Sequence, residues 1–90
     1  MSKITNCISS FNNLNHVKLA VKSVRENSYY KDSPLIVLAE NCQDGTDEWL
    51  KENAKKWNIE YYIEKNENPM GIGGGMNFCA KRVKTEFINF

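Results

Sequence analysis

The chain has 90 residues, of which 41% are hydrophobic and 26% charged, and its formal net charge is +1. These values fit one small globular domain and exclude the basic patch that binds nucleic acid or an anionic membrane. No apolar run approaches the roughly 20 residues of a transmembrane segment, and the first residues lack the apolar core of a secretory signal. The 3 cysteines are far apart, without a C-x-x-C pair, which is typical of reduced thiols and predicts a cytoplasmic protein.

The first half of the chain alternates strand and helix patterns. Residues 4–11 predict a strand whose poor alternation suits a central position, covered on both faces. Asn15 is placed to cap a helix whose apolar positions 17, 20, 21 and 24 follow helical spacing. Residues 35–39 form a continuous apolar run, which predicts a buried parallel strand.

The second half continues the alternation. Asp47 and Glu48 place negative charge in the first turn of a second helix, whose apolar face is formed by Trp49, Leu50, Ala54 and Trp57. Residues 59–64 alternate, which predicts a strand at a sheet edge with one solvated face. Residues 66–75 predict a loop. A third helix is then expected through residue 83, with Lys81, Arg82 and Lys84 in its last turns, and residues 84–90 predict a final strand.

Three of the loops follow a strand and open a helix, so a parallel sheet would bring them to one edge. They comprise residues 9–12, 40–44 and 71–77. An acidic or amide side chain after the second strand is placed to bond a base or ribose hydroxyl, and helix N-termini suit a diphosphate. Taken alone, Asp44 is better explained as a turn and cap residue than as a ligand contact, and Asn12 as a turn residue.

The glycine-rich stretch at residues 71–77, GIGGGMN, needs a physical reason. It does not match the dinucleotide fingerprint, which requires a small residue where Met76 stands and lies in the first strand–helix turn. It also lacks the G-K-[ST] of a P-loop. Glycine in regular structure costs about 0.5–1 kcal/mol, so the backbone either takes positive φ or is approached closely. A mobile loop ordered by a ligand and a tight helix start both remain open.

Four motifs in this order carry a resemblance. They are the strand end Ile8–Asn12, the acidic loop Glu40–Thr46 ending in D-G-T, the set Asn68, Gly71 and Asn77, and the strand Glu86–Phe90. Together they resemble the N-terminal part of a family-2 glycosyltransferase with the A-type fold, in which an Asp-x-Asp follows the fourth strand. Two departures stand out: Ala39 takes the first place of the usual acidic pair, and two residues separate Asn68 from Gly71.

The resemblance implies a Rossmann-like α/β fold of three α/β/α layers. Its mostly parallel sheet of about four strands would have the order 3-2-1-4, as the N-terminal half of a glycosyltransferase A-type fold. Residues 1–90 would form a single truncated domain that binds a nucleotide-diphosphate sugar. The implied reaction transfers the sugar to an acceptor hydroxyl, usually with inversion.

The same resemblance implies that the catalytic groups lie outside this chain. A divalent cation, Mn or Mg, held by the Asp-x-Asp would neutralise the leaving diphosphate in the full-length parent, and a later carboxylate would take the acceptor proton. We therefore expect no catalytic residue and no bound cation in residues 1–90. The remaining roles are all in nucleotide-sugar binding, and they fall to Ser9, Phe11, Asn12, Glu40, Asn41, Asp44, Gly71, Gly74 and Asn77.

The sequence leaves one other function open and argues against a second. One is a non-catalytic nucleotide-binding or interaction module that kept the architecture. The other, a nucleotidyltransferase, would need a basic glycine-rich loop after the first strand, which residues 9–14 do not offer. In the implied strand order the fourth strand has an uncovered outer edge, so we also expect a homo-oligomer that forms through residues 86–90.

Overall fold

The computed structural model describes residues 4–27 and 29–90. Residues 1–3, part of the segment read for a secretory signal, lie outside the described residues, as does Ser28. The elements in chain order are β1 (Ile4–Ser10), α1 (Leu14–Glu26), β2 (Leu35–Glu40), α2 (Thr46–Trp57), β3 (Glu60–Glu64), α3 (Gly71–Ala80) and β4 (Phe87–Asn89).

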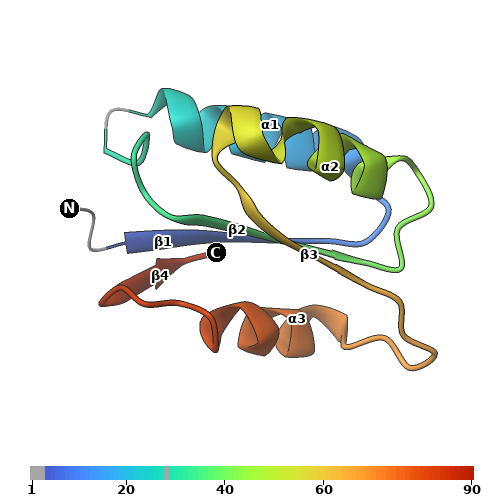
Figure 1. Ribbon diagram of the computed structural model, residues 1–90. Helices are drawn as coiled ribbons and strands as arrows, with labels where there is room; N and C mark the ends of the chain where they lie inside the picture. The colour runs from blue at the N-terminus through green and yellow to red at the C-terminus, as the bar shows by residue number, and fades with distance from the viewer. Residues whose placement is uncertain (1–3, 28) are drawn as a thin grey trace.

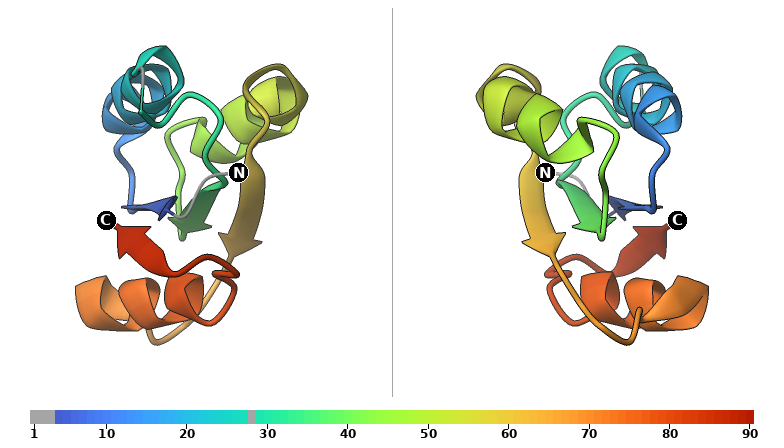
Figure 2. Two further views of the ribbon diagram at one scale, coloured as in Figure 1. Left: turned by 90° about the vertical axis from the view of Figure 1, so that its left-hand side faces the viewer. Right: turned by 90° about the vertical axis from the view of Figure 1, so that its right-hand side faces the viewer.

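The strands form one parallel sheet in the order β3-β2-β1-β4. Helices α1 and α2 cover one face of the sheet and α3 covers the other (Figure 1, Figure 2). The predicted three-layer fold and the predicted strand order are therefore confirmed.

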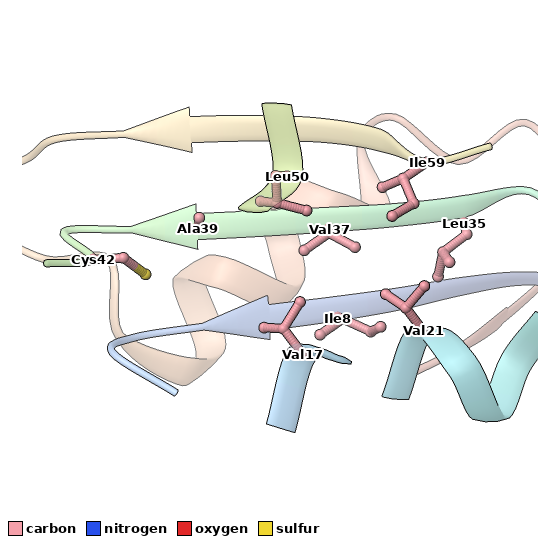
Figure 3. Packing of buried hydrophobic residues seen from close by; sticks show 9 residues of the cluster. All are labelled: Ile8, Val17, Val21, Leu35, Val37, Ala39, Cys42, Leu50 and Ile59. Atoms are coloured by element: carbon pink, nitrogen blue, oxygen red, sulfur yellow. The ribbon is translucent and has the colours of Figure 1, made fainter. Parts of the chain in front are cut away.

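The larger core lies between the sheet and the two helices α1 and α2 (Figure 3). Strand β2 is buried along its whole length because helices lie over both of its faces. Its alternate residues Leu35, Val37 and Ala39 belong to this core. They meet α1 through Val17 and Val21 and α2 mainly through Leu50, so the predicted apolar faces of both helices are confirmed in position.

The smaller core lies under α3 and contains Cys7, Ile36, Leu38 and Cys79. Beside it, the rings of Tyr62 and Phe78 meet edge to face with centroids 5.4 Å apart. Strand β3 lies at the sheet edge as predicted. Its second face is less solvated than expected, because Tyr62 packs there against α3.

The start of α1 differs from the prediction. The capping residue is Asn13, not Asn15, and its Oδ1 accepts a hydrogen bond from the His16 N–H at 3.3 Å. The first helical amide, that of Leu14, donates to Asp44 Oδ2 at 2.8 Å. This contact comes from a loop 30 residues away, so local sequence does not reveal where the helix begins.

The glycine-rich stretch also differs from the prediction, because residues 71–75, expected to belong to a loop, form the start of α3. A Cβ on Gly75 would lie 2.7 Å from Ser9 Oγ, so any larger residue would displace the Ser9 side chain, and glycine suits the close approach of the helix to the end of β1. Gly71 has a φ of +71°, a conformation that favours glycine. Of the two readings left open, the tight helix start is the one that the structure supports.

The end of α3 is earlier than predicted, at Ala80. Lys81, Arg82 and Lys84 therefore follow the helix instead of lying in its last turn. Arg82 still contacts the helix, since its Nη1 donates to the Phe78 carbonyl at 2.8 Å and its guanidinium lies 3.5 Å from the centre of the Phe78 ring. The expected cation at the helix C-terminus is thus supplied by one side chain from outside.

Candidate functional site

A cleft of about 390 Å³ opens at the carboxyl edge of the sheet. It lies where β1 and β2 end beside the start of α3, the place where open parallel sheets bind ligands. The residues that line it are Ser9, Ser10, Phe11, Glu40, Pro69, Gly71 and Met76. Four of the predicted site residues, Ser9, Phe11, Glu40 and Gly71, are therefore brought together around one hollow.

The β1 side of the cleft combines hydroxyls with an exposed ring. Phe11 is 60% exposed, so its ring is available to an incoming ligand. The neighbouring Ser10 hydroxyl is buried and has no hydrogen-bond partner in the part of the chain that the structure describes. A buried unpaired hydroxyl costs about 1–3 kcal/mol. Ser10 was missed among the predicted site residues, although its place between Ser9 and Phe11 at a strand end was a signal.

Glu40 supplies the only acidic side chain among the residues that line this cleft. It is 6% exposed, and its carboxylate accepts hydrogen bonds from Asn66 Nδ2 at 2.7 Å and from the Met70 N–H at 2.9 and 3.1 Å. Both donors belong to the segment that precedes α3, which we call the 66–70 loop (residues 66–70). The carboxylate is therefore already bonded within the protein, and a contact between Glu40 and a ligand stays a prediction.

Asn41 contacts the same loop. Its Oδ1 accepts from the Asn66 N–H at 2.8 Å, and its Nδ2 donates to the Asn66 carbonyl at 2.9 Å. The Asn41 N–H donates to the Glu64 carbonyl at 2.9 Å, which continues the pairing of β2 with β3. Asn41 does not line the cleft, but its side chain is bonded to the 66–70 loop, which does contribute to the lining.

Asp44 ties two helices together at the same edge. Besides the bond from Leu14, its Oδ1 accepts from the Thr46 hydroxyl at 2.6 Å and from the Thr46 N–H at 3.2 Å. These bonds, that of the Thr46 hydroxyl foremost, lower the pKa of Asp44 below its usual range. The side chain does not line the cleft, and its contacts match the turn and cap role.

Three further predicted residues stand outside the cleft lining. Asn12 has a φ of +54° and accepts a hydrogen bond from the Gln43 N–H at 2.5 Å, so it joins two loops. Gly74 packs close to Met70, since a Cβ on it would lie 2.8 Å from the Met70 Cβ. Asn77 is exposed on α3. Pro69 and Met76 also line the cleft; Met76 belongs to the segment 71–77 expected at this edge, but neither residue was among the predicted site residues.

The described residues contain neither a metal-binding cluster nor a membrane-spanning helix. Within residues 4–27 and 29–90, no group of histidine, cysteine, aspartate or glutamate side chains is placed to hold a metal ion. Over the same described ranges, no helix has the length and apolar character needed to cross a membrane. All three cysteines are free thiols and are buried.

Comparisons with known proteins agree on the fold. The family model described as Glycosyl transferase family 2 matches residues 5–90. Among solved structures, the chain is similar to the mannosyltransferase PcManGT from Pyrobaculum calidifontis in complex with GDP-Man and Mn²⁺, with a TM-score of 0.73 and 14% sequence identity. The match covers 91% of this chain but only 24% of that one. A comparison with curated proteins finds no significant match.

Proposed function

Since the chain belongs to glycosyl transferase family 2, we propose that it is the part of a transferase that binds a nucleotide-diphosphate sugar for transfer to an acceptor hydroxyl. The observation that carries the proposal is the cleft at the carboxyl edge, with an exposed ring beside hydroxyl groups. A base needs a flat apolar surface, and a ribose needs hydrogen-bonding groups close by. The cleft offers both within about 390 Å³.

We place the base against Phe11, since aromatic rings bind bases by stacking. Ser9 and Ser10 then lie near the ribose or diphosphate. Of the glycines and amides assigned to the same groups, the cleft supports Gly71, which lines it. Asn12, Asn41 and Asp44 contribute by holding the surrounding loops in place.

A divalent cation is implied by the family resemblance, and the mannosyltransferase that this fold matches was solved with Mn²⁺. The described residues of this chain do not fit such an ion, because they offer no cluster of ligating side chains. We therefore assign no cation chemistry to residues 4–27 and 29–90. The cytoplasmic location likewise remains a proposal, based on composition and on the three free cysteines.

Calorimetric titration with UDP and GDP tests the binding proposal. We expect dissociation constants in the high micromolar to millimolar range, because no metal clamps the diphosphate. Phe11→Ala should weaken binding by about fivefold or more, as loss of base stacking does. Tyr29→Ala is a matched control, since Tyr29 is an aromatic residue, 88% exposed, that does not line the cleft. Absence of binding at millimolar nucleotide would contradict the proposal.

A transfer assay separates binding from catalysis. Incubated with nucleotide sugars, manganese and acceptors, the 90-residue chain should show no turnover above background, since neither a metal site nor an acceptor base is assigned to it. Robust transfer would show that residues 1–90 hold catalytic groups. The alternative function, a non-catalytic module, predicts the same result, and an Asp-x-Asp encoded shortly after Phe90 would favour the transferase.

We also propose that two copies associate through β4. Phe87, Ile88 and Phe90 are 59%, 37% and 54% exposed, and among the described residues β4 pairs only with β1. An uncovered strand edge of this kind is a template for pairing. Ile88→Lys should shift sedimentation toward the monomer, whereas Leu19→Lys, at an exposed leucine on α1, should not. A wild-type chain that stays monomeric at high concentration would refute the interface.

A further inference from the structure

The hydrogen-bond partners of Glu40 indicate its role within the cleft. Its carboxylate receives three hydrogen-bond contacts, and all of them come from Asn66 and Met70 of the 66–70 loop. The Met70 N–H is the amide immediately before α3, so a negative charge from the end of β2 sits at the N-terminus of that helix. Charge and macrodipole attract each other in this geometry. Glu40 therefore fixes both the end of the loop and the start of α3.

The anchored segment is a wall of the cleft. Pro69 and Gly71, on either side of Met70, both line the cleft. Met70 is also packed against the first turn of α3, because a Cβ on Gly74 would lie 2.8 Å from its Cβ. Releasing the Met70 amide from Glu40 would therefore loosen this wall of the cleft, leaving the packing against Gly74 as a contact that holds it.

The same bonds leave Glu40 poorly suited to read a base. An ionised carboxylate has about four acceptor sites, but Glu40 is only 6% exposed and both of its oxygens are turned to the loop, from which they accept. The preceding residue, Ala39, is fully buried in the core beneath α1 and α2. The other residues that line the cleft offer hydroxyls, backbone and apolar surface, namely Ser9, Ser10, Phe11, Pro69, Gly71 and Met76.

We propose that Glu40 is a positioning residue that holds the 66–70 loop in place, and that the cleft consequently discriminates weakly between nucleobases. The inference rests on the proposed function for its ligand, a nucleoside diphosphate. Stacking is tolerant of base identity because every base has an aromatic face. Affinities for UDP, GDP and ADP should therefore agree within about fivefold. Glu40→Ala should weaken all three alike, by about tenfold, because only molecules with the loop in place bind.

A pair of substitutions isolates the bond to the loop. Glu40→Gln removes the charge and leaves one oxygen to accept from both Asn66 and Met70, so the loop should be held less firmly and binding should weaken, though less than in Glu40→Ala. Adding Asn66→Asp supplies an acceptor for the new amide and should restore most of the affinity, whereas Asn66→Asp alone sets two carboxylates together and should weaken binding. The two bonds between the Asn41 side chain and the Asn66 backbone involve neither substituted side chain, so they should be present in all four proteins.

The Met70 amide gives a readout that does not depend on a nucleotide. Its hydrogen exchange, followed by NMR, should be slow in the wild type and in the double variant and fast in Glu40→Ala. Recovery of both affinity and protection in the double variant supports the positioning role. If Glu40→Ala does not fold, as judged by circular dichroism, the Gln and Asp variants decide the question.

Three outcomes would overturn the inference. They are a Met70 amide that exchanges equally fast in every variant, a double variant with no recovery, and a wild type that prefers one base by more than about tenfold and loses that preference in Glu40→Gln. Failure of the proposed function has a different signature. No nucleotide would then bind the wild type, while the Met70 amide would still report whether Glu40 holds the loop.

Discussion

The two edges of the sheet are closed by different chemistry. At the amino edge, a single arginine side chain is hydrogen-bonded to the loops that lead into β2 and β3. The Arg25 guanidinium, in the last turn of α1, donates to the carbonyls of Ser33 at 2.6 Å, Trp57 at 2.7 Å, Asn58 at 2.9 Å, Lys31 at 3.2 Å and Tyr30 at 3.4 Å. Burial lowers the pKa of Arg25, and the nearby Asp32 charge opposes that shift.

At the carboxyl edge, several short side chains hold the loops together by hydrogen bonds, in place of one long side chain. Asn12, Asn41 and Asp44 each tie neighbouring loops, and Glu40 ties the 66–70 loop. The two edges have hollows of similar volume. The hollow at the amino edge, beside Ser33 and Asn58, has about 320 Å³, and the cleft at the carboxyl edge has about 390 Å³. The difference lies in available groups, because at the amino edge the carbonyls are already bonded to Arg25. The carboxyl edge keeps the exposed Phe11 ring beside the exposed Ser9 side chain, and is therefore the edge suited to a ligand.

The largest effect is expected at the amino edge. Arg25→Ala should lower the free energy of unfolding by about 2–3 kcal/mol, because several carbonyls lose a charged donor. Arg25→Lys should recover only part of this, since an ammonium donates from a single point. Urea unfolding measures both, with Lys22→Ala, at an exposed position of the same helix, as the control. If Arg25→Ala costs no more than Lys22→Ala, the guanidinium does not close this edge.

A smaller effect is expected where α3 meets the carboxyl edge. Gly73→Ala should raise the free energy of unfolding by about 0.5–1 kcal/mol, because alanine is the better helix former and a Cβ there has nothing within 4 Å. Gly75→Ala should show no such gain, since its Cβ would lie 2.7 Å from Ser9 Oγ. Urea unfolding of the two variants compares them directly. A larger gain for Gly75→Ala would show that the close approach to β1 does not require glycine.

The smallest effect concerns the pH dependence of stability. The pKa of Asp44 is lowered from 3.8 in the folded protein, mainly by the Thr46 hydroxyl, so the ionised carboxylate stabilises the fold above that value. This contribution should disappear as pH falls below 3.8 through the folded pKa. Asp44→Asn should therefore be less stable than wild type at pH 7 and approach it in acid. Thermal unfolding at several pH values measures this, with Glu52→Gln on α2 as the control, and a constant difference would contradict the cap role.

Local sequence patterns predicted most of the fold, because the spacing of apolar residues indicates which faces of the strands and helices are buried. The apolar run of β2 and the helical spacing of Val17 and Val21 fixed the layers, and the resemblance supplied the strand order. The two misplaced helix starts involve contacts between segments far apart in the sequence instead. At the start of α1 the Leu14 amide is bonded to Asp44, and in α3 the small Gly75 lets the helix lie close to Ser9 of β1.

For the candidate site, too, the positions of the residues could be predicted but their contacts could not. Parallel topology alone brings Ser9, Phe11, Glu40 and Gly71 to one edge. What the sequence could not reveal is the partner of each polar group. The bond from Met70 to Glu40 uses a backbone amide, which every residue but proline carries. Its presence depends on the path of the 66–70 loop, which no local pattern specifies.

Chemical-shift mapping by NMR tests the contrast between the two edges most directly. On titration with UDP or GDP, amide signals of residues 9–12, 66–68 and 70–77 should move, while those of residues 25, 30–33 and 57–60 around the Arg25 guanidinium should not. A Phe11→Ala variant should lose the shifts at the carboxyl edge. Shifts confined to the amino edge, or spread evenly over both edges, would contradict the assignment of the ligand site to the carboxyl edge.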